Sequence, residues 1–181
     1  SKLYTRGKGN EGFDISHLIP FVKLPDTKDI VVRGELIIKK ENFKKYQKEY
    51  SNERSFAAGM VNGKKLEKSK LQDLDFVAYE VIKPELTPIA QLAYLVGLGN
   101  IEIVQAMETS QISNEKLSEL LVNWRENYKY EIDGIIIVND EIYPRPKKNP
   151  EYAVAFKMVI SDQVVEAKVV DVLWTPSKDG Y

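Results

Sequence analysis

The chain has 181 residues, 43% of them hydrophobic, a length and composition that fit one domain with a sizeable core. It has no cysteine and a single histidine, His17, which excludes disulfides, cysteine-ligated zinc, thiol nucleophiles and metal sites built from several histidines. The formal net charge of −1, from 26 basic and 27 acidic residues, argues against a globally basic nucleic-acid binder but permits local basic patches.

The first half of the chain is expected to contain two strands with a short helix between them. Runs of β-branched residues predict strands over 30–39 and 75–82. Aromatic residues at three- and four-residue steps predict a lysine-rich helix over 41–50. The residues from 51 to 70 are expected to form a loop.

Two helices are expected in the middle of the chain. Thr87, a capping residue followed by proline, predicts a helix over 89–96 that ends at one of the two glycines that follow. The pattern over 101–107 fits a strand or a helix. Ser113 is expected to cap a clearer helix. Its apolar stripe has helical spacing and consists of Leu117, Leu120, Leu121 and Trp124.

Strands are expected again in the last third, over 130–138, 152–160 and 164–174. The fold class is therefore α+β, with mostly antiparallel sheets and peripheral helices. No apolar run approaches the ~18–20 residues that a membrane span needs, and the polar N-terminus is unlike a signal peptide. We therefore expect a soluble intracellular protein.

Three of the predicted strands carry candidate binding or catalytic residues. Arg33 and Glu35 share a face, where opposite charges must pair or face a polar cavity. Asp133 and Gly134 open an otherwise apolar strand, so the glycine either marks the close approach of a ligand or of other backbone, or belongs to a strand that enters from an acidic turn. Lys157 shares its face with two alanines. It either faces solvent at an edge or binds a phosphate or carboxylate in the space that they leave.

Five short motifs follow one another along the chain in an order that is more specific than any one of them. They are Thr-Arg-Gly-Lys-Gly at 5–9, Val-Arg-Gly-Glu at 32–35, Asn-Glu-Arg-Ser at 52–55, Glu-Ile-Asp-Gly at 131–134 and Ala-Val-Ala-Phe-Lys at 153–157. Together they resemble the adenylation (nucleotidyltransferase) domain of NAD-dependent DNA ligases, most of all those of large DNA viruses. The resemblance implies the covalent nucleotidyltransferase fold, which is ATP-grasp-like. It also implies sealing of nicks in duplex DNA through an enzyme–AMP intermediate, with NAD as the AMP donor and Mg²⁺ as the divalent cation.

The resemblance implies a role for each matching residue in the first three motifs. Arg6 contacts the nucleotide and, in a second role, the phosphate at the nick. Glu35 accepts hydrogen bonds from the ribose hydroxyls, and Arg33 orients Glu35. Arg54 faces phosphate or the nicked strand.

The later residues complete the implied site. Tyr79 stacks on adenine and Ile136 covers the other face of the base, the alternative for Tyr79 being a core aromatic on a strand. Lys157 contacts the AMP phosphate and acts in catalysis. Asp133 and Gly134 support the site. The resemblance leaves the metal-ligating residues open.

The family's nucleophilic lysine lies in a Lys-x-Asp-Gly motif upstream of Thr-Arg-Gly, and the 181 residues do not contain that motif. Lys2 has no Asp-Gly behind it, so it does not match the nucleophile. We therefore expect a piece of a larger enzyme. Residues 1–164 are expected to be an adenylation domain that lacks its N-terminal part, and residues 165–181 a linker and the first strand of an OB-fold domain.

Several positions depart from the family pattern. Val138 stands where the family usually has a lysine, so phosphate is bound more weakly or by another cation at 145–148. Lys8 replaces an aspartate in a loop near the DNA. Glu53 and Ser55 flank the motif arginine in place of proline and asparagine.

Two alternatives remain open. An ATP-dependent ligase of DNA or RNA shares the pocket but usually has Glu-Gly where this chain has Asp133-Gly134. A non-catalytic nucleotide- or DNA-binding module descended from a ligase is favoured by Val138 and by the missing nucleophile motif. The expected partners are NAD or AMP and nicked duplex DNA, without a membrane. We expect a monomer in the cytoplasm or nucleus, or at a viral replication site if the chain is viral.

Overall fold

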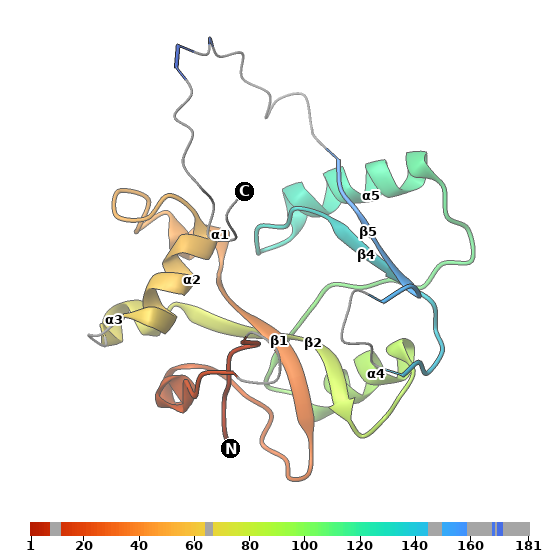
Figure 1. The fold of residues 1–181 in the computed structure, drawn as a ribbon, viewed down its shortest axis with the longest axis horizontal. Coiled ribbons are helices and arrows are strands. Elements are labelled where there is room, and N and C mark those ends of the chain that lie inside the picture. Colours follow the sequence, from red (N-terminus) through yellow and green to blue (C-terminus); the bar gives the residue numbers. More distant parts are fainter. Residues whose placement is uncertain (8–11, 64–66, 145–149, 159–167, 169, 172–181) are drawn as a thin grey trace.

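A computed structural model describes residues 1–7, 12–63, 67–144, 150–158, 168, 170 and 171 (Figure 1). In chain order the elements are η1 (Ser16–Phe21), β1 (Val31–Ile38), α1 (Lys40–Phe43), α2 (Glu53–Asn62), α3 (Lys68–Leu71), β2 (Leu74–Lys83), α4 (Pro88–Leu98), β3 (Glu102–Ile103), α5 (Asn114–Asn127), β4 (Ile135–Val138) and β5 (Ala153–Phe156). In the described part, the strands form one sheet in the order β1-β2-β3 and a second sheet of β4 and β5. The predicted mixture of α and β structure is confirmed.

The antiparallel pair β1–β2 is the centre of the molecule, and β3 extends it in parallel with β2. Glu35 lies opposite Val77, and Arg33 lies opposite Glu80. The register shifts between these two pairs, which leaves Tyr79 as an extra residue on β2. Such bulges redirect side chains and increase the local twist. The Tyr79 side chain is 44% exposed, so it is not a core aromatic.

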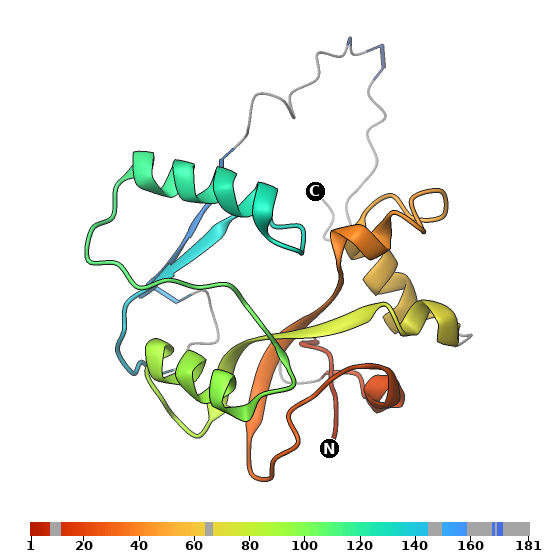
Figure 2. The ribbon, with the colours of Figure 1, turned by 180° about the vertical axis from the view of Figure 1, so that it is seen from behind.

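The main hydrophobic core lies on the opposite face of β1–β2. Alternate residues of a strand point to opposite faces, and Ile38 of β1 points to the core face. Helices cover this face: α2 supplies Phe56 and α4 supplies Leu95, both fully buried. Figures 1 and 2 show α2 and α3 at the end where β1 stops and β2 begins, with α4 near the other end of β2. The face with Glu35 and Tyr79 therefore stays away from the main core.

The second sheet packs with α5. Leu117 and Leu121 on α5 and Ile135 on β4 are buried, whereas Ile136 on the other face of β4 is 68% exposed. Figure 2 shows α5 running alongside β4 and β5. The exposed face of this sheet is thus left for other contacts.

The two predicted helix starts are confirmed. Thr87 accepts a hydrogen bond from the backbone N–H of Ala90, and Ser113 accepts one from Lys116. Each cap satisfies a backbone donor that the helix leaves unpaired. Gly99 ends α4 with a φ of 62°, a backbone conformation that glycine adopts without strain. In the described part of the chain, every helix is too short or too polar to span a lipid bilayer.

The helix predicted over 41–50 is wrong beyond its first turn. The α-helix ends at Phe43, and the chain continues through turns in which Tyr46 donates to the carbonyl of Phe43. The aromatic spacing has another cause, because Tyr46 and Tyr50 both fold onto Phe56, at ring-centroid distances of 4.8 and 5.2 Å. The rings pack a core without continuing a helix.

The loop predicted over 51–70 is also wrong, because it contains α2 and most of α3. Asn52 accepts a hydrogen bond from the backbone N–H of Ser55 at 2.8 Å, and Ser55 accepts one from that of Asn52 at 3.1 Å. This capping box starts α2. The capping box is the sequence signal that the loop prediction missed, since the apolar pattern of α2 is too weak to reveal the helix.

The late strands are shorter than predicted. Residues 130–134 are not strand, and the ambiguous segment over 101–107 forms a strand only at β3. The end of the strand predicted over 152–160 and most of that predicted over 164–174 lie outside the described residues. The same holds for Lys8 and for the cations at 145–148.

Gly34 brings β1 and β2 close together, which gives a testable difference from Gly97. A Cβ at Gly34 would lie 2.5 Å from Cζ of Phe76 and 2.6 Å from the carbonyl oxygen of Val77, whereas one at Gly97 meets nothing within 4 Å. Gly34→Ala is expected to lower the free energy of unfolding by about 1–3 kcal/mol. Gly97→Ala, inside α4, is expected to raise it by about 0.5–1 kcal/mol. Denaturant midpoints check both, and equal effects would contradict this packing.

Candidate functional site

Four of the predicted site residues gather on the face of β1–β2 that is turned away from the main core. Burial raises the pKa of Tyr79, and the charges of Arg33, Glu80, Glu35 and Arg6 lie close enough to act on the same hydroxyl. Glu35 and Arg6 are exposed. The arrangement presents an aromatic ring surrounded by a carboxylate and cations, which suits a base attached to polar and anionic groups.

Arg33 has a different partner from the expected one. Its Nη1 donates to Oε2 of Glu80 at 2.9 Å. The expected partner was Glu35, but the register shift places Glu80 opposite Arg33 on the neighbouring strand. Arg33 therefore braces the strand pair beside Tyr79, and its expected orientation of Glu35 stays a prediction.

The second sheet carries the other predicted nucleotide residues on one face. Ile136 lies opposite Ala155 and Val138 opposite Ala153, so these four side chains share a face. Lys157 follows Ala155 by two residues, just beyond the end of β5. The small alanines leave the exposed Ile136 as a flat apolar surface with a cation at its end. Val138, in the family's usual lysine position, is part of this surface and is 41% exposed.

Three predicted residues from separate motifs meet at one carboxylate. Nζ of Lys157 lies 3.0 Å from Oδ2 of Asp133, and Nη2 of Arg54 lies 3.6 Å from the same oxygen. Arg54 stands in the first turn of α2, so the capping box of that helix positions it. The hydrogen bond from Lys157, aided by the charge of Arg54, holds the pKa of Asp133 below its ordinary value. Asp133 is therefore ionised at neutral pH and orients two cations.

Gly134 is needed for this arrangement. A Cβ there would lie 2.6 Å from the carbonyl oxygen of Phe156 and 2.8 Å from Cγ of Lys157. The missing side chain lets the Lys157 stem lie across the start of β4. Of the two readings of this glycine, the close approach of another part of the chain is the one that the structure supports.

The lowered pKa of Asp133 predicts a pH dependence. Its contribution to the free energy of unfolding is fully present above the ordinary carboxyl pKa of 3.8 and is lost as the pH falls through the lower folded value. Because the side chain is 55% exposed, we expect less than about 1 kcal/mol. Asp133→Asn should lack this dependence. Denaturant titrations at several pH values check it, and identical pH profiles for both proteins would contradict it.

Sequence reasoning missed Arg125, in the last turn of α5. Its Nε donates to the carbonyl of Ile132 at 3.3 Å, and its Nη2 donates to that of Asp133 at 3.2 Å. Its own carbonyl accepts a hydrogen bond from Nζ of Lys40, just after β1. Arg125 thus fixes the backbone that carries the Asp133 carboxylate. An arginine at a helix end close before Asp-Gly was the only available sequence signal.

Metal binding by this chain alone has little support among the described residues, which contain no group of three or more His, Cys, Asp or Glu side chains that could hold an ion. Mg²⁺ usually keeps several waters and binds through one or two carboxylates together with substrate phosphates.

Comparisons with known proteins agree with the motif order. Residues 1–160 match the family described as NAD-dependent DNA ligase adenylation domain. The DNA ligase of Acanthamoeba polyphaga mimivirus is 37% identical over 189 residues, which cover 99% of this chain and 29% of that protein. Putative DNA ligase 205R of Invertebrate iridescent virus 6 is 39% identical over 194 residues, covering 99% of this chain and 31% of that protein.

Cellular relatives are more distant. The DNA ligase of Clostridioides difficile is 28% identical over 201 residues, which cover 97% of this chain and 29% of that protein. The chain spans about a third or less of the length of these curated relatives. The resemblance seen in the sequence is confirmed: this chain belongs to the NAD-dependent DNA ligase adenylation domain family.

Proposed function

We propose that this chain binds the AMP donor of a DNA ligase that takes AMP from NAD and seals nicks in duplex DNA. The observation that carries the proposal is the pair of exposed faces, one with Tyr79 and Glu35 and the other with Ile136 and Lys157. Each face offers an apolar surface beside a group that binds ribose or phosphate. The names of the relatives, which are DNA ligases, support the reaction class.

In the proposed complex, adenine lies between Tyr79 and Ile136. Stacking on an aromatic side chain contributes about 1–3 kcal/mol per base. The Glu35 carboxylate accepts hydrogen bonds from the ribose hydroxyls, because a carboxylate has lone pairs for both. Lys157, turned toward this face by Asp133, donates to the AMP phosphate.

The proposed chemistry is nucleotidyl transfer to a lysine. The lysine nitrogen loses a proton and forms a bond to the adenylyl phosphorus of NAD, while the bond to the nicotinamide mononucleotide phosphate breaks and that group leaves with the electron pair. Lys157 and Arg6 stabilise the negative charge on the phosphate oxygens in the transition state. The resemblance places the attacking lysine in a motif that the 181 residues do not contain.

We also propose roles for a divalent cation, for Arg54 and for Arg6. A Mg²⁺ ion bound to the phosphates of NAD would neutralise part of their charge. Arg54 has a side chain that is 72% exposed, so it can reach the phosphate at the nick. Arg6 serves both the nucleotide and the nick.

Several broader assignments belong to the same proposal. The domain has the covalent nucleotidyltransferase fold, which is ATP-grasp-like, over residues 1–164, and an OB-fold domain begins within 165–181. The protein acts as a monomer in the cytoplasm or nucleus, or at a viral replication site.

The identity of the nucleotide that donates AMP tests this proposal. We expect the complete protein to become covalently labelled when it is incubated with NAD that is radiolabelled in its adenylate phosphate, and to stay unlabelled with ATP labelled in the same phosphate. Labelling from ATP alone would favour an ATP-dependent ligase. Labelling from neither donor would favour a non-catalytic module.

A further inference from the structure

Two faces are proposed to bind the nucleotide, one with Tyr79 and Glu35 and the other with Ile136 and Lys157. These two nucleotide-binding faces belong to parts of the chain that pack separately. In the described residues, the main core contains side chains from η1 through α4 and reaches β3, and it includes none from α5, β4 or β5. Leu117, Leu121 and Ile135 are buried outside that core. The main core therefore does not set the spacing between the two faces.

A second, small cluster joins the two parts. It consists of Ile37 on β1, Val77 on β2 and Tyr130, which is only 2% exposed and lies between α5 and β4. Ile37 is two residues from Glu35 on the same strand, and Val77 is two residues from Tyr79. Side chains two residues apart in a strand share a face. Tyr130 thus packs against Ile37 and Val77, which neighbour Glu35 and Tyr79 along the two strands.

A carboxylate holds the hydroxyl end of Tyr130. The Tyr130 Oη donates to Oδ2 of Asp75 at 2.9 Å, and Nζ of Lys39 lies 3.3 Å from the same oxygen. Burial raises the pKa of Tyr130 far above its ordinary value, so the hydroxyl remains a donor at any physiological pH. Asp75 and Lys39 continue the rows formed by Val77 and Ile37, which fixes the tyrosine along both strands.

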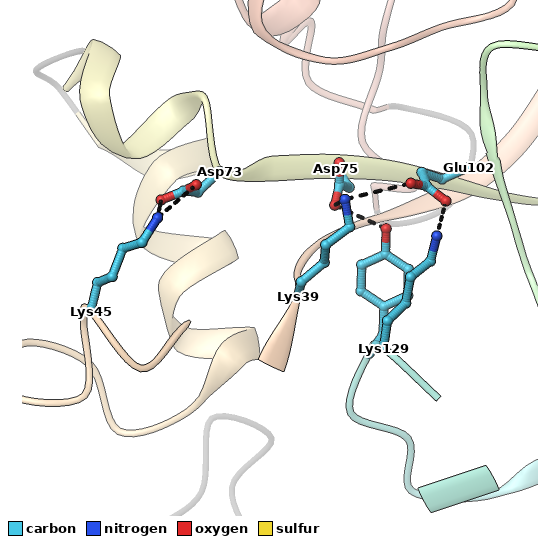
Figure 3. Close-up of polar contacts among 7 residues, drawn as sticks. Lys39, Lys45, Asp73, Asp75, Glu102 and Lys129 are labelled. Atoms are coloured by element: carbon cyan, nitrogen blue, oxygen red, sulfur yellow. Dashed lines mark hydrogen bonds and ion pairs between the residues drawn. The ribbon is translucent and has the colours of Figure 1, made fainter. Parts of the chain in front are cut away.

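A second ion pair ties the preceding residue to the sheet. Lys129 contacts Glu102 of β3, and Glu102 lies 3.5 Å from Nζ of Lys39 (Figure 3). Lys39 therefore links both carboxylates, Asp75 and Glu102. Through this network the segment just before β4 is tied to β2, to β3 and to the end of β1.

We propose that Tyr130 is a positioning residue that sets the spacing and angle between the two nucleotide-binding faces. Its ring packs against Ile37 and Val77, and its hydrogen bond to Asp75 fixes the ring in place. The inference rests on the proposed function, because it assumes that both faces bind one nucleotide. The loss of the hydroxyl lets β4 shift relative to β1–β2 without removing any group that touches the ligand.

The chain contains a matched control for this hydroxyl. Tyr46 donates to Oδ2 of Asp73 at 2.7 Å, and Nζ of Lys45 lies 3.2 Å from the same oxygen. The pair has the same chemistry as Tyr130 with Asp75 and Lys39, but it lies at the main core. Figure 3 shows the Lys45–Asp73 pair along the chain from Asp75.

The test compares Tyr130→Phe with Tyr46→Phe in the complete protein. Both variants lose one tyrosine–aspartate hydrogen bond, so we expect a similar fall in unfolding temperature. Only Tyr130→Phe should weaken equilibrium binding of NAD, on the order of tenfold, because small displacements of positioned groups have effects of this size. Asp75→Asn and Asp73→Asn are a second matched pair with the same expected difference.

A double-mutant cycle with Ile136→Ala separates positioning from general destabilisation. If Tyr130 acts through β4, Tyr130→Phe and Ile136→Ala together weaken NAD binding by less than the product of their separate effects. The effects of Tyr46→Phe and Ile136→Ala should multiply. Equal NAD affinity in Tyr130→Phe and Tyr46→Phe overturns the inference. If neither Ile136→Ala nor Lys157→Ala changes NAD binding or labelling, the proposed function fails, and the inference fails with it.

Discussion

Lys157→Ala in the complete protein is expected to reduce covalent AMP transfer from NAD by at least about a hundredfold. The ammonium group is held by Asp133 just before β4, and positioned charges that stabilise a transition state commonly contribute a hundredfold or more. Its side chain is 62% exposed and its described ion pair is with Asp133. We therefore expect the free energy of unfolding to change by less than about 1 kcal/mol. Single-turnover labelling and denaturant unfolding measure the two effects.

Lys116→Ala is the control for this variant. Lys116 is also an exposed lysine that contacts one polar side chain, Oε1 of Gln111, but it lies on α5. It should label at the wild-type rate. Wild-type labelling by Lys157→Ala would show that this lysine does not act on the phosphate.

Arg125→Met is expected to slow AMP transfer by about tenfold to a hundredfold. The methionine fills similar space but donates neither hydrogen bond to the Ile132 and Asp133 carbonyls, so the carboxylate that orients Lys157 moves. Misplacement of a catalytic group by a fraction of an ångström to 1 Å has effects of this order. Loss of the two bonds should also lower the free energy of unfolding by about 1–3 kcal/mol.

Two further variants show whether the effect of Arg125→Met is due to the lost hydrogen bonds. Arg125→Lys retains the charge but not the planar fork, so it should recover little of the rate. Glu126→Gln changes the exposed neighbour on α5 and should behave as the wild type. If Arg125→Met lost stability as expected but transferred AMP at the normal rate, the arginine would be structural only.

Local patterns in the sequence predict much of the fold and part of the site. The caps at Thr87 and Ser113 and the two-residue period of β1 depend on neighbouring residues alone, so they could be predicted correctly. The same period predicts that Arg33 and Glu35 share a face. The motif order supplies the family, since no single motif is specific enough.

The features that the sequence does not predict depend on contacts between segments that are far apart in the chain. The register shift that gives Arg33 its partner Glu80 requires the pairing of β1 with β2, which the sequence does not specify. Asp133 meets Arg54 only after α2 and β4 are both in place. The burial of Tyr130 against Asp75 is equally long-range, and an aromatic residue just before a strand gives no sign of it.

The central claim is that two separate faces bind one nucleotide, and a crystal structure of the complete protein with NAD tests it most directly. We predict adenine between Tyr79 and Ile136, the ribose hydroxyls on Glu35 and the adenylyl phosphate on Lys157. Adenine on only one of the two faces, or a phosphate away from Lys157, would contradict the account.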